Sequence, residues 1–346
     1  MKDITILAVD LAKSSFQAHG NDHRGRCIFR RSLRREGLKK LLGNLDSCVV
    51  AFETCGSSHY WGRLAREAGH EVRLIPAQYV KPFVKNNKND RHDAEAIAEA
   101  AVRPNIHFVA IKSAEQLDIQ FLHRIRSRLV RQRTSLVNEM RAIAFEHGIT
   151  IPLGVVACEK EIAALTLDSE SELISSICRT TLADLLNELR VLQKRIKTTE
   201  ARLLSLTKKN DLCERLQTIP GIGPLSASAL VSSVGDPSSF KNGRQFAASL
   251  GLVPRHSGTG GAHKNKILGI SKRGDSYLRQ LLVHGARTVI QHVDKRCDPE
   301  AEWIKKLKEA KGWNKTAVAL ANKNARIVWS LMVNEDMVYT AKKMCS

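Results

Sequence analysis

The stretch Ile4-Thr5-Ile6-Leu7-Ala8-Val9-Asp10 is a short apolar run that ends on a carboxylate, and such a run predicts a buried strand. A second run, Cys48-Val49-Val50-Ala51-Phe52-Glu53, ends in the same way. An unpaired buried charge is costly, so each terminal carboxylate must face water, a cation or another partner. We therefore interpret Asp10 and Glu53 as candidate site residues at the ends of two strands.

A further acidic pair, Asp90 and Asp93, begins a helix-forming segment. A spacing of three residues places both on one side of the helix start. Four converging carboxylates would repel one another unless cations neutralised them, and hard oxygen ligands suit Mg²⁺, with Mn²⁺ as an alternative. A pair of such ions is the usual device for phosphoryl transfer on nucleic acid. The alternative for each acid alone is a turn or capping residue.

The charge balance points to a polyanionic partner. The chain has 346 residues, with 55 Lys and Arg against 35 Asp and Glu, a formal charge of +20. A chain this basic usually meets nucleic acid. Only 5% of the residues are aromatic, so phosphate contacts should outweigh base stacking. The length allows two or three domains.

Cysteine usage and hydropathy favour a cytoplasmic protein. None of the eight cysteines forms a Cys-x-x-Cys pair, so a zinc knuckle or redox motif is not supported. Several lie in apolar runs, as expected for free thiols in a reducing cytosol. The sequence has no signal peptide and no apolar run long enough to span a membrane, so we expect no membrane partner.

The order of predicted elements over the first part of the chain indicates an α/β fold. Residues 1 to about 110 read as a three-stranded meander followed by a helix at 37–45, a strand at 48–53, a helix near 59–68 and a strand at 71–75. The helix that begins at Asp90 comes last. This is the order of a ribonuclease-H-like domain, and helices dominate the remainder, so the predicted fold class is α/β plus all-α.

Three short blocks carry a family resemblance. Val9-Asp10-Leu11-Ala12-Lys13, Phe52-Glu53-Thr54-Cys55-Gly56 and Asn89-Asp90-Arg91-His92-Asp93-Ala94 resemble the blocks of the DEDD transposases of insertion sequences. The resemblance implies a RuvC-like domain over residues 1–112. It places the family's metal-binding, catalytic acids at Asp10, Glu53, Asp90 and Asp93. The better-studied members are recombinases guided by a bridge RNA, so it also implies a guide RNA.

Residues 113–210 are predicted to form a helical coiled-coil arm. Its first helix, at 115–147, carries many arginines, which we interpret as a face that binds the nucleic-acid backbone; a solvated charged face is the alternative. Its second helix repeats an a/d heptad pattern. The partner of that seam is either residues 115–147, folded back antiparallel, or a second subunit. The seam residues are Leu182, Leu185, Leu189, Leu192, Ile196, Thr199, Leu203 and Leu206.

After the arm, Pro220-Gly221-Ile222-Gly223 resembles the turn of a helix-hairpin-helix. In such a turn, glycines let backbone N–H groups approach a phosphate, and the next helix begins with its positive end facing that phosphate. The alternative is a simple glycine turn between two packed helices.

The C-terminal part, residues 211–346, resembles the mainly helical transposase domain that accompanies the DEDD domain. The resemblance rests on the blocks 246–261 and 268–279, which contain Gly-Leu-x-Pro and Ile-Ser-Lys-x-Gly-Asp patterns. It implies that a serine in the intervening loop becomes covalently joined to DNA. Counting in register from Pro254 lands on Thr259, whereas Ser257 offers the less hindered primary hydroxyl. Both remain candidates.

The patterns and the family resemblance together predict a Mg²⁺-dependent transposase or recombinase, and the resemblance implies that it forms a covalent 5′-phosphoprotein. Its partners would be donor and target double-stranded DNA, a guide RNA and further copies of itself, as a dimer or tetramer. The rivals are a hydrolytic RuvC-like nuclease, such as a junction resolvase, and a non-catalytic binding scaffold. The candidate nucleic-acid-binding residues are Lys13, Lys88, Arg124, Arg128, Arg131, Gly221, Gly223, Arg255, Lys264, Lys272 and Arg273.

Overall fold

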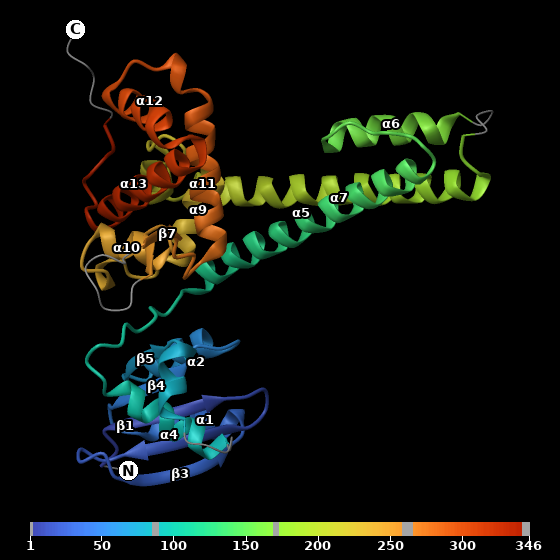
Figure 1. The fold of residues 1–346 in the computed structure, drawn as a ribbon. Coiled ribbons are helices and arrows are strands. Elements are labelled where there is room, and N and C mark those ends of the chain that lie inside the picture. The colour runs from blue at the N-terminus through green and yellow to red at the C-terminus, as the bar shows by residue number, and fades with distance from the viewer. Residues whose placement is uncertain (1–2, 85–89, 169–172, 258–265, 341–346) are drawn as a thin grey trace. The chain divides into compact units, whose positions relative to one another are not determined.

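The computed structural model describes residues 3–84, 90–168, 173–257 and 266–340, which fold as two compact units (Figure 1). The first unit comprises Met1–Gln116 with Val234–Ser239, and the second comprises Leu117–Ser233 with Phe240–Ser346. The predicted coiled-coil arm and the C-terminal helices therefore lie in one unit. The division into three domains at 112 and 210 stays a prediction.

The first unit is built on a mixed sheet of five strands in the order β3-β2-β1-β4-β5. The antiparallel meander consists of β1 (Ile6–Leu11), β2 (Phe16–Asn21) and β3 (Cys27–Leu33). The parallel half adds β4 (Val49–Glu53) beside β1 and β5 (Glu71–Ile75) beside β4. The predicted α/β character of this part of the chain is confirmed.

Alternation along the central strands supplies apolar side chains to both faces of the sheet. Leu7 and Phe52 belong to the cluster under α1 (Arg35–Asn44) and α2 (Ser58–Glu67). Ala8, from the same strand as Leu7, joins the cluster on the opposite face. Successive strand residues point to opposite faces, so a strand covered on both sides reads as a continuous apolar run.

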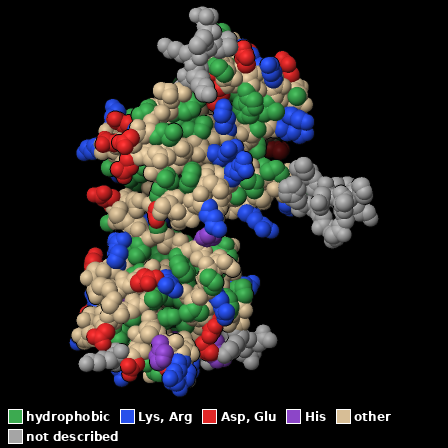
Figure 2. All heavy atoms as spheres, turned by 90° about the vertical axis from the view of Figure 1, so that its left-hand side faces the viewer, with side chains coloured by type: hydrophobic (Ala, Val, Ile, Leu, Met, Phe, Trp, Pro, Cys, Tyr) green, Lys and Arg blue, Asp and Glu red, His purple; other side chains and the backbone are tan. Residues whose placement is uncertain are grey.

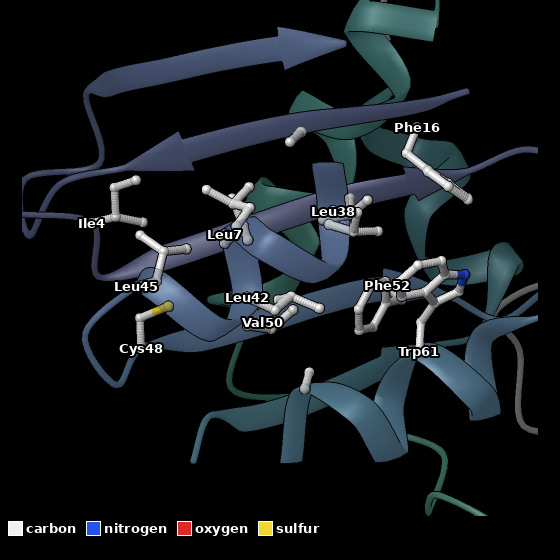
Figure 3. Packing of buried hydrophobic residues seen from close by; sticks show 14 of the residues in the cluster. Ile4, Leu7, Phe16, Leu38, Leu42, Leu45, Cys48, Val50, Phe52 and Trp61 are labelled. Carbon is white, nitrogen blue, oxygen red and sulfur yellow. The ribbon is translucent and has the colours of Figure 1, made fainter. Parts of the chain in front are cut away.

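The cluster under α1 and α2 is anchored by aromatic rings (Figure 3). Phe16 of β2 meets Trp61 of α2 edge to face, with ring centroids 5.1 Å apart. Leu38 of α1 is fully buried beside them. The opposite face is covered mainly by α4 (Asp90–Ala101). In the sequence, α4 follows the short α3 (Ala77–Val80) and the 3₁₀ turn at Lys81–Phe83. Small alanines on α4 allow its close approach to the sheet.

The second unit begins with three helices that share one apolar cluster. These are α5 (Ala114–Glu146), α6 (Val155–Leu167) and α7 (Ser176–Thr207). Leu129 of α5 and Leu189 of α7 are both fully buried in this cluster. The apolar seam of α7 is therefore covered within the chain, by α5 and α6. Pairing with a second subunit stays a prediction.

The C-terminal end of the predicted heptad seam is wrong. Thr207 is buried in place of Leu206, which is 37% exposed, whereas Leu185 is partly buried against the same cluster as its buried neighbour Leu186. A heptad pattern repeats every 3.5 residues, whereas a straight helix turns every 3.6. The buried residues of α7 follow the 3.6-residue period, so they depart from the heptad positions toward the C-terminal end of the helix.

The rest of the second unit is mainly helical, which confirms the predicted helical character of the C-terminal part. A hairpin of β6 (Pro254–Ser257) and β7 (Lys266–Ile270) interrupts the helices, and no described helix is long and apolar enough to cross a membrane. The helices are α8 (Asp211–Gln217), α9 (Pro224–Ser233), α10 (Gly243–Ser249), α11 (Ser276–Gln291), α12 (Pro299–Lys311) and α13 (Trp313–Val333).

Replacing a buried leucine of α7 should cost more unfolding free energy than replacing an exposed one. We expect Leu189→Asp to lower the free energy of unfolding by more than about 3 kcal/mol, because it buries an unpaired carboxylate. Leu206→Asp, the matched control on the exposed side, should change it by less than about 0.5 kcal/mol. Thermal and urea unfolding of both variants test this, and equal losses would contradict the seam seen here.

Candidate functional site

The two strand-terminal acids lie at one end of the sheet. Parallel pairing matches Val9 of β1 with Phe52 of β4, so the next residues, Asp10 and Glu53, follow at the same end of adjacent strands. Both side chains are half-buried. Parallel register thus does what the sequence pattern predicted, since it delivers two carboxylates to neighbouring positions.

Helix α4 supplies the acidic pair. It begins at Asp90 and packs against β1, β2 and β4, and Asp93 in its first turn lies close enough to Glu53 for its charge to act on that carboxyl group. The Asp93 side chain is half-buried there, and the Asp90 side chain lies outside the described part of the structure. Of the four predicted acids, the described structure therefore places Asp10 and Asp93 near enough to Glu53 for their charges to act on its carboxyl group.

Electrostatic coupling links these three carboxylates. Burial raises the pKa of Glu53, and the negative charges of Asp10 and Asp93 raise it further. Burial, with Asp10 and Glu53, likewise raises the pKa of the neighbouring Cys55 thiol, which keeps that thiol protonated. The site thus concentrates negative charge that a bound cation would relieve.

The carboxylates at this edge form a partial donor set for a metal ion. Among the described side chains, which do not include Asp90, no three His, Cys, Asp or Glu residues are close enough together to hold one. The chemistry nevertheless fits, because Asp10, Glu53 and Asp93 offer hard carboxylate oxygens of the type that Mg²⁺ prefers. Their mutual repulsion at Glu53 is the observation that supports a cation at this edge.

The hairpin β6–β7 holds the predicted nucleophile loop. Ser257 is the last residue of β6, whereas Thr259 and Lys264 lie outside the described residues. The base of the hairpin is closed by backbone hydrogen bonds, since the Ser271 amide donates to the Val253 carbonyl at 2.8 Å.

Two glycines lock this base. Gly251 has a φ of +70°, and a Cβ placed on it would collide with the backbone of Arg273. Gly274 has a φ of +85°, and a Cβ there would collide with the Ser249 carbonyl. The two C-terminal sequence patterns are therefore packed backbone against backbone. Lys272, which lies between these two glycines in the sequence, has a φ of 56°. This left-handed backbone conformation is unfavourable for residues other than glycine.

The two glycines of the turn before α9 have different surroundings. Gly221 has a φ of +89°, and a Cβ on it would stand 2.9 Å from the carbonyl oxygen of Gly285 in α11. Packing alone therefore accounts for a glycine at 221, as in the simple turn between packed helices. Gly223 is exposed, and a Cβ there would have nothing within 4 Å. Phosphate binding by either glycine stays a prediction.

The predicted basic contacts are mostly exposed. Arg124, Arg128 and Arg131 project from α5, and Lys88 lies outside the described residues. On the face drawn in Figure 2, lysines and arginines are scattered among acidic and apolar side chains. Their exposure would allow contacts with nucleic acid, and that role stays a prediction. The other exposed candidates are Lys13, Arg255, Lys272 and Arg273.

Sequence reasoning missed a buried polar chain that joins α5 to α9 and α11. The Tyr277 hydroxyl lies 3.0 Å from His123 Nδ1, and Ser228 Oγ lies 3.1 Å from His123 Nε2. Burial lowers the pKa of His123 to about 4, so the ring is neutral at physiological pH. Because the Ser228 hydroxyl donates to the Pro224 carbonyl, Nε2–H must donate to Ser228 and Nδ1 must accept from Tyr277.

The chain continues into the arm helices. Arg126 hydrogen-bonds Tyr277 and forms an ion pair with Glu200 of α7, at 2.6 Å between Nε and Oε1. Tyr277 lies within the C-terminal sequence block, but nothing in the sequence around His123 distinguishes it from the other polar residues of α5. Only the three-dimensional packing reveals the connection.

Comparison with known proteins gives a consistent answer. A profile described as "Transposase IS116/IS110/IS902 family" matches residues 213–301, and a DEDD profile of the IS110 type, described as "Transposase", matches residues 7–146. A probable family 20 transposase of Pseudomonas aeruginosa is 44% identical over 96% of this chain and 98% of its own length.

Two further relatives are informative. The transposase for insertion sequence element IS1111A of Coxiella burnetii is 43% identical, over 97% of this chain and 92% of its own length. A pilin gene-inverting protein of Moraxella bovis is 24% identical, over 80% of each chain.

The two turn glycines should respond differently to alanine. Gly221→Ala should lower the free energy of unfolding by about 1 kcal/mol or more, from the left-handed backbone and the contact with Gly285. Gly223→Ala should stay within about 0.5 kcal/mol of the parent protein. Urea unfolding measures both, and an unfolding curve of Gly221→Ala that matches the parent protein would disprove the packing role.

Neutralising Glu53 should stabilise the fold. A carboxyl group with a raised pKa in the folded chain costs stability once pH exceeds its ordinary value, because the unfolded chain ionises more readily. Without divalent cations, Glu53→Gln should therefore raise the melting temperature at pH 7–8, and the gain should fade as pH drops toward about 4. Glu67→Gln, at the exposed end of α2, is the control. A lower melting temperature for Glu53→Gln at neutral pH would refute the coupling.

Proposed function

Because the chain belongs to the IS116/IS110/IS902 family of transposases, we propose that it cuts and rejoins DNA strands through a covalent 5′-phosphoprotein. The observation that carries the metal-dependent part of the proposal is the edge at which Asp10, Glu53 and Asp93 concentrate negative charge. The resemblance to a pilin gene-inverting protein supports recombination, because inverting a DNA segment requires cutting and rejoining its strands.

The first unit is proposed to be a RuvC-like domain of the ribonuclease-H-like class. Its meander, parallel pair and covering helices follow that order. Asp10, Glu53 and Asp93, with Asp90, would hold Mg²⁺. When bound, the metal would supply Lewis-acid polarisation of a phosphoryl oxygen. The carboxylates of this chain would hold the metal in position. The parallel pairing of β1 with β4 fixes the spacing between Asp10 and Glu53.

The nucleophile is proposed to be a hydroxyl of the β6–β7 loop, either Ser257 or Thr259. Its oxygen would attack the DNA phosphorus, its proton would go to a base, and the 3′ oxygen would leave as a hydroxyl. The new phosphoester conserves the energy of the broken one, so a second 3′ hydroxyl can attack it and regenerate the enzyme. The interlocked base formed by Gly251 and Gly274 would hold the loop on a rigid support.

DNA is the substrate of a transposase, and the remaining partners are proposals. A charge of +20 fits a large phosphate surface, and few aromatic residues fit recognition by backbone contacts with sequence choice delegated to a guide RNA. Acids and nucleophile lie in different units, so assembly into a dimer or tetramer would allow a site completed across subunits.

The hydrolytic nuclease is the second candidate. It shares the acidic edge, and water would replace the loop hydroxyl as nucleophile. The specific observation in its favour is that the carboxylate set alone would suffice for metal-assisted hydrolysis. The two candidates differ in whether protein becomes joined to DNA.

A denaturing gel of labelled DNA that carries the element's own ends, with the RNA that copurifies, tests this function. The parent protein should form a shifted covalent band, and Asp10→Asn should form none while still binding nucleic acid. One of Ser257→Ala and Thr259→Ala should abolish the band, and the other should only slow its appearance. Mass spectrometry of the adducted peptide then identifies the nucleophile.

Three outcomes of this gel would contradict the assignment. Cleavage without a covalent band would favour hydrolysis. A band that persists in both loop variants would place the nucleophile elsewhere, with Ser271 as the next candidate. Wild-type rates in Asp10→Asn would remove the acids from the chemistry.

A further inference from the structure

One face of α5 lines a cavity in the second unit. Gln120, Arg124, Ser127 and Arg131 recur at intervals of four, three and four residues, which places them on a single side of the helix. Together with the C-terminal end of α9 and the first residues of α11, they enclose a cavity of about 250 Å³. Arg128 of the same helix does not line it.

The walls of this cavity are fixed by hydrogen bonds. The Gln120 side-chain amide donates to the Ser232 carbonyl at 3.1 Å and to Ser233 Oγ at 3.2 Å, which ties α5 to the end of α9. His123 and Tyr277 line the cavity and are held by their mutual bond at 3.0 Å. A cavity whose walls are already ordered can bind a ligand at a low entropic cost.

Charged side chains of both signs line the cavity, and Asp275, Arg124 and Arg131 are all exposed. Asp275 and the carbonyl end of α9 contribute negative charge and hydrogen-bond acceptors. Arg124 and Arg131 are exposed and contribute guanidinium groups suited to phosphate. A free phosphate would be drawn to the arginines but repelled by the Asp275 carboxylate. The ligand that satisfies both carries an anionic end and a neutral end rich in N–H donors.

We propose that this cavity holds one unpaired nucleotide of a nucleic-acid strand. Its base would enter with an exocyclic amine directed at Asp275 and the acceptors of α9, and its flanking phosphates would lie on Arg124 and Arg131. The volume is below the roughly 300 Å³ at which drug-sized pockets begin, which suits a single base and excludes a duplex. The inference rests on the proposed function, in which the chain binds nucleic acid.

A preference for particular bases would distinguish binding at this site from nonspecific electrostatic attraction to phosphates. Adenine and cytosine carry an exocyclic amine, whereas thymine and uracil do not. Fluorescence anisotropy with labelled oligoadenylate and oligothymidylate should show about tenfold tighter binding of the adenylate, since one hydrogen bond to a charged group contributes on the order of 1.5 kcal/mol. Oligoriboadenylate and oligouridylate, measured in parallel, distinguish an RNA source from a DNA source.

Three variants complete the test. Ser127→Leu fills the cavity without changing charge, and Asp275→Asn removes the carboxylate while keeping an oxygen to cap α11, where Asp275 accepts from the Tyr277 and Leu278 amides at 2.8 and 3.0 Å. Both should reduce the preference for adenine to less than about twofold. Arg128→Ala, the charge control, should weaken adenylate and thymidylate binding equally and keep their ratio.

Two results would overturn the proposal in distinguishable ways. Equal affinity of the parent protein for adenylate and thymidylate, or a preference that survives in both cavity variants, would refute the nucleotide site alone. Failure of the parent protein to bind any of the four oligonucleotides would refute both the site and the proposed binding of nucleic acid.

Discussion

The parallel pairing of β1 with β4 is the constraint on which the proposed chemistry depends. It sets Asp10 and Glu53 at the same end of neighbouring strands, and α4 adds Asp93. Burial raises the pKa of Glu53 and the nearby charges of Asp10 and Asp93 raise it further, so at neutral pH the fold is less stable than it would be with a neutral residue there. Natural proteins accept such a cost at sites where the concentrated charge is used.

The second unit contains a different device, a chain of hydrogen-bonded polar groups that passes from partly exposed to buried positions. It runs from Glu200 and Arg126 of the arm helices through Tyr277 and His123 to Ser228 of α9. The same Tyr277 stands at the start of α11, directly after the glycine-locked base of the hairpin. The arm helices and the proposed nucleophile loop thus share one rigid support.

Sequence patterns predicted the strands that end on acids and the long helices, because burial on both faces of a sheet or along one helix stripe leaves a readable periodicity. They missed the C-terminal end of the α7 seam, where Thr207 is buried in place of Leu206, because a straight helix does not keep a 3.5-residue period. They could not decide the role of Gly221, because its partner Gly285 is distant in sequence. The pairing of His123 with Tyr277 was hidden for the same reason.

The central assignment, a cation site at the acidic edge, is tested most directly by calorimetric titration with Mn²⁺. The parent protein and Asp10→Asn would be titrated near pH 6 in two buffers of different ionisation enthalpy. We predict that the parent protein binds the ion and releases protons, because a bound cation lowers the raised pKa of Glu53. Asp10→Asn should bind at least tenfold more weakly, at the lower end of the effect of losing a metal-site group. Equal binding by both proteins, or binding by neither, would contradict the assignment.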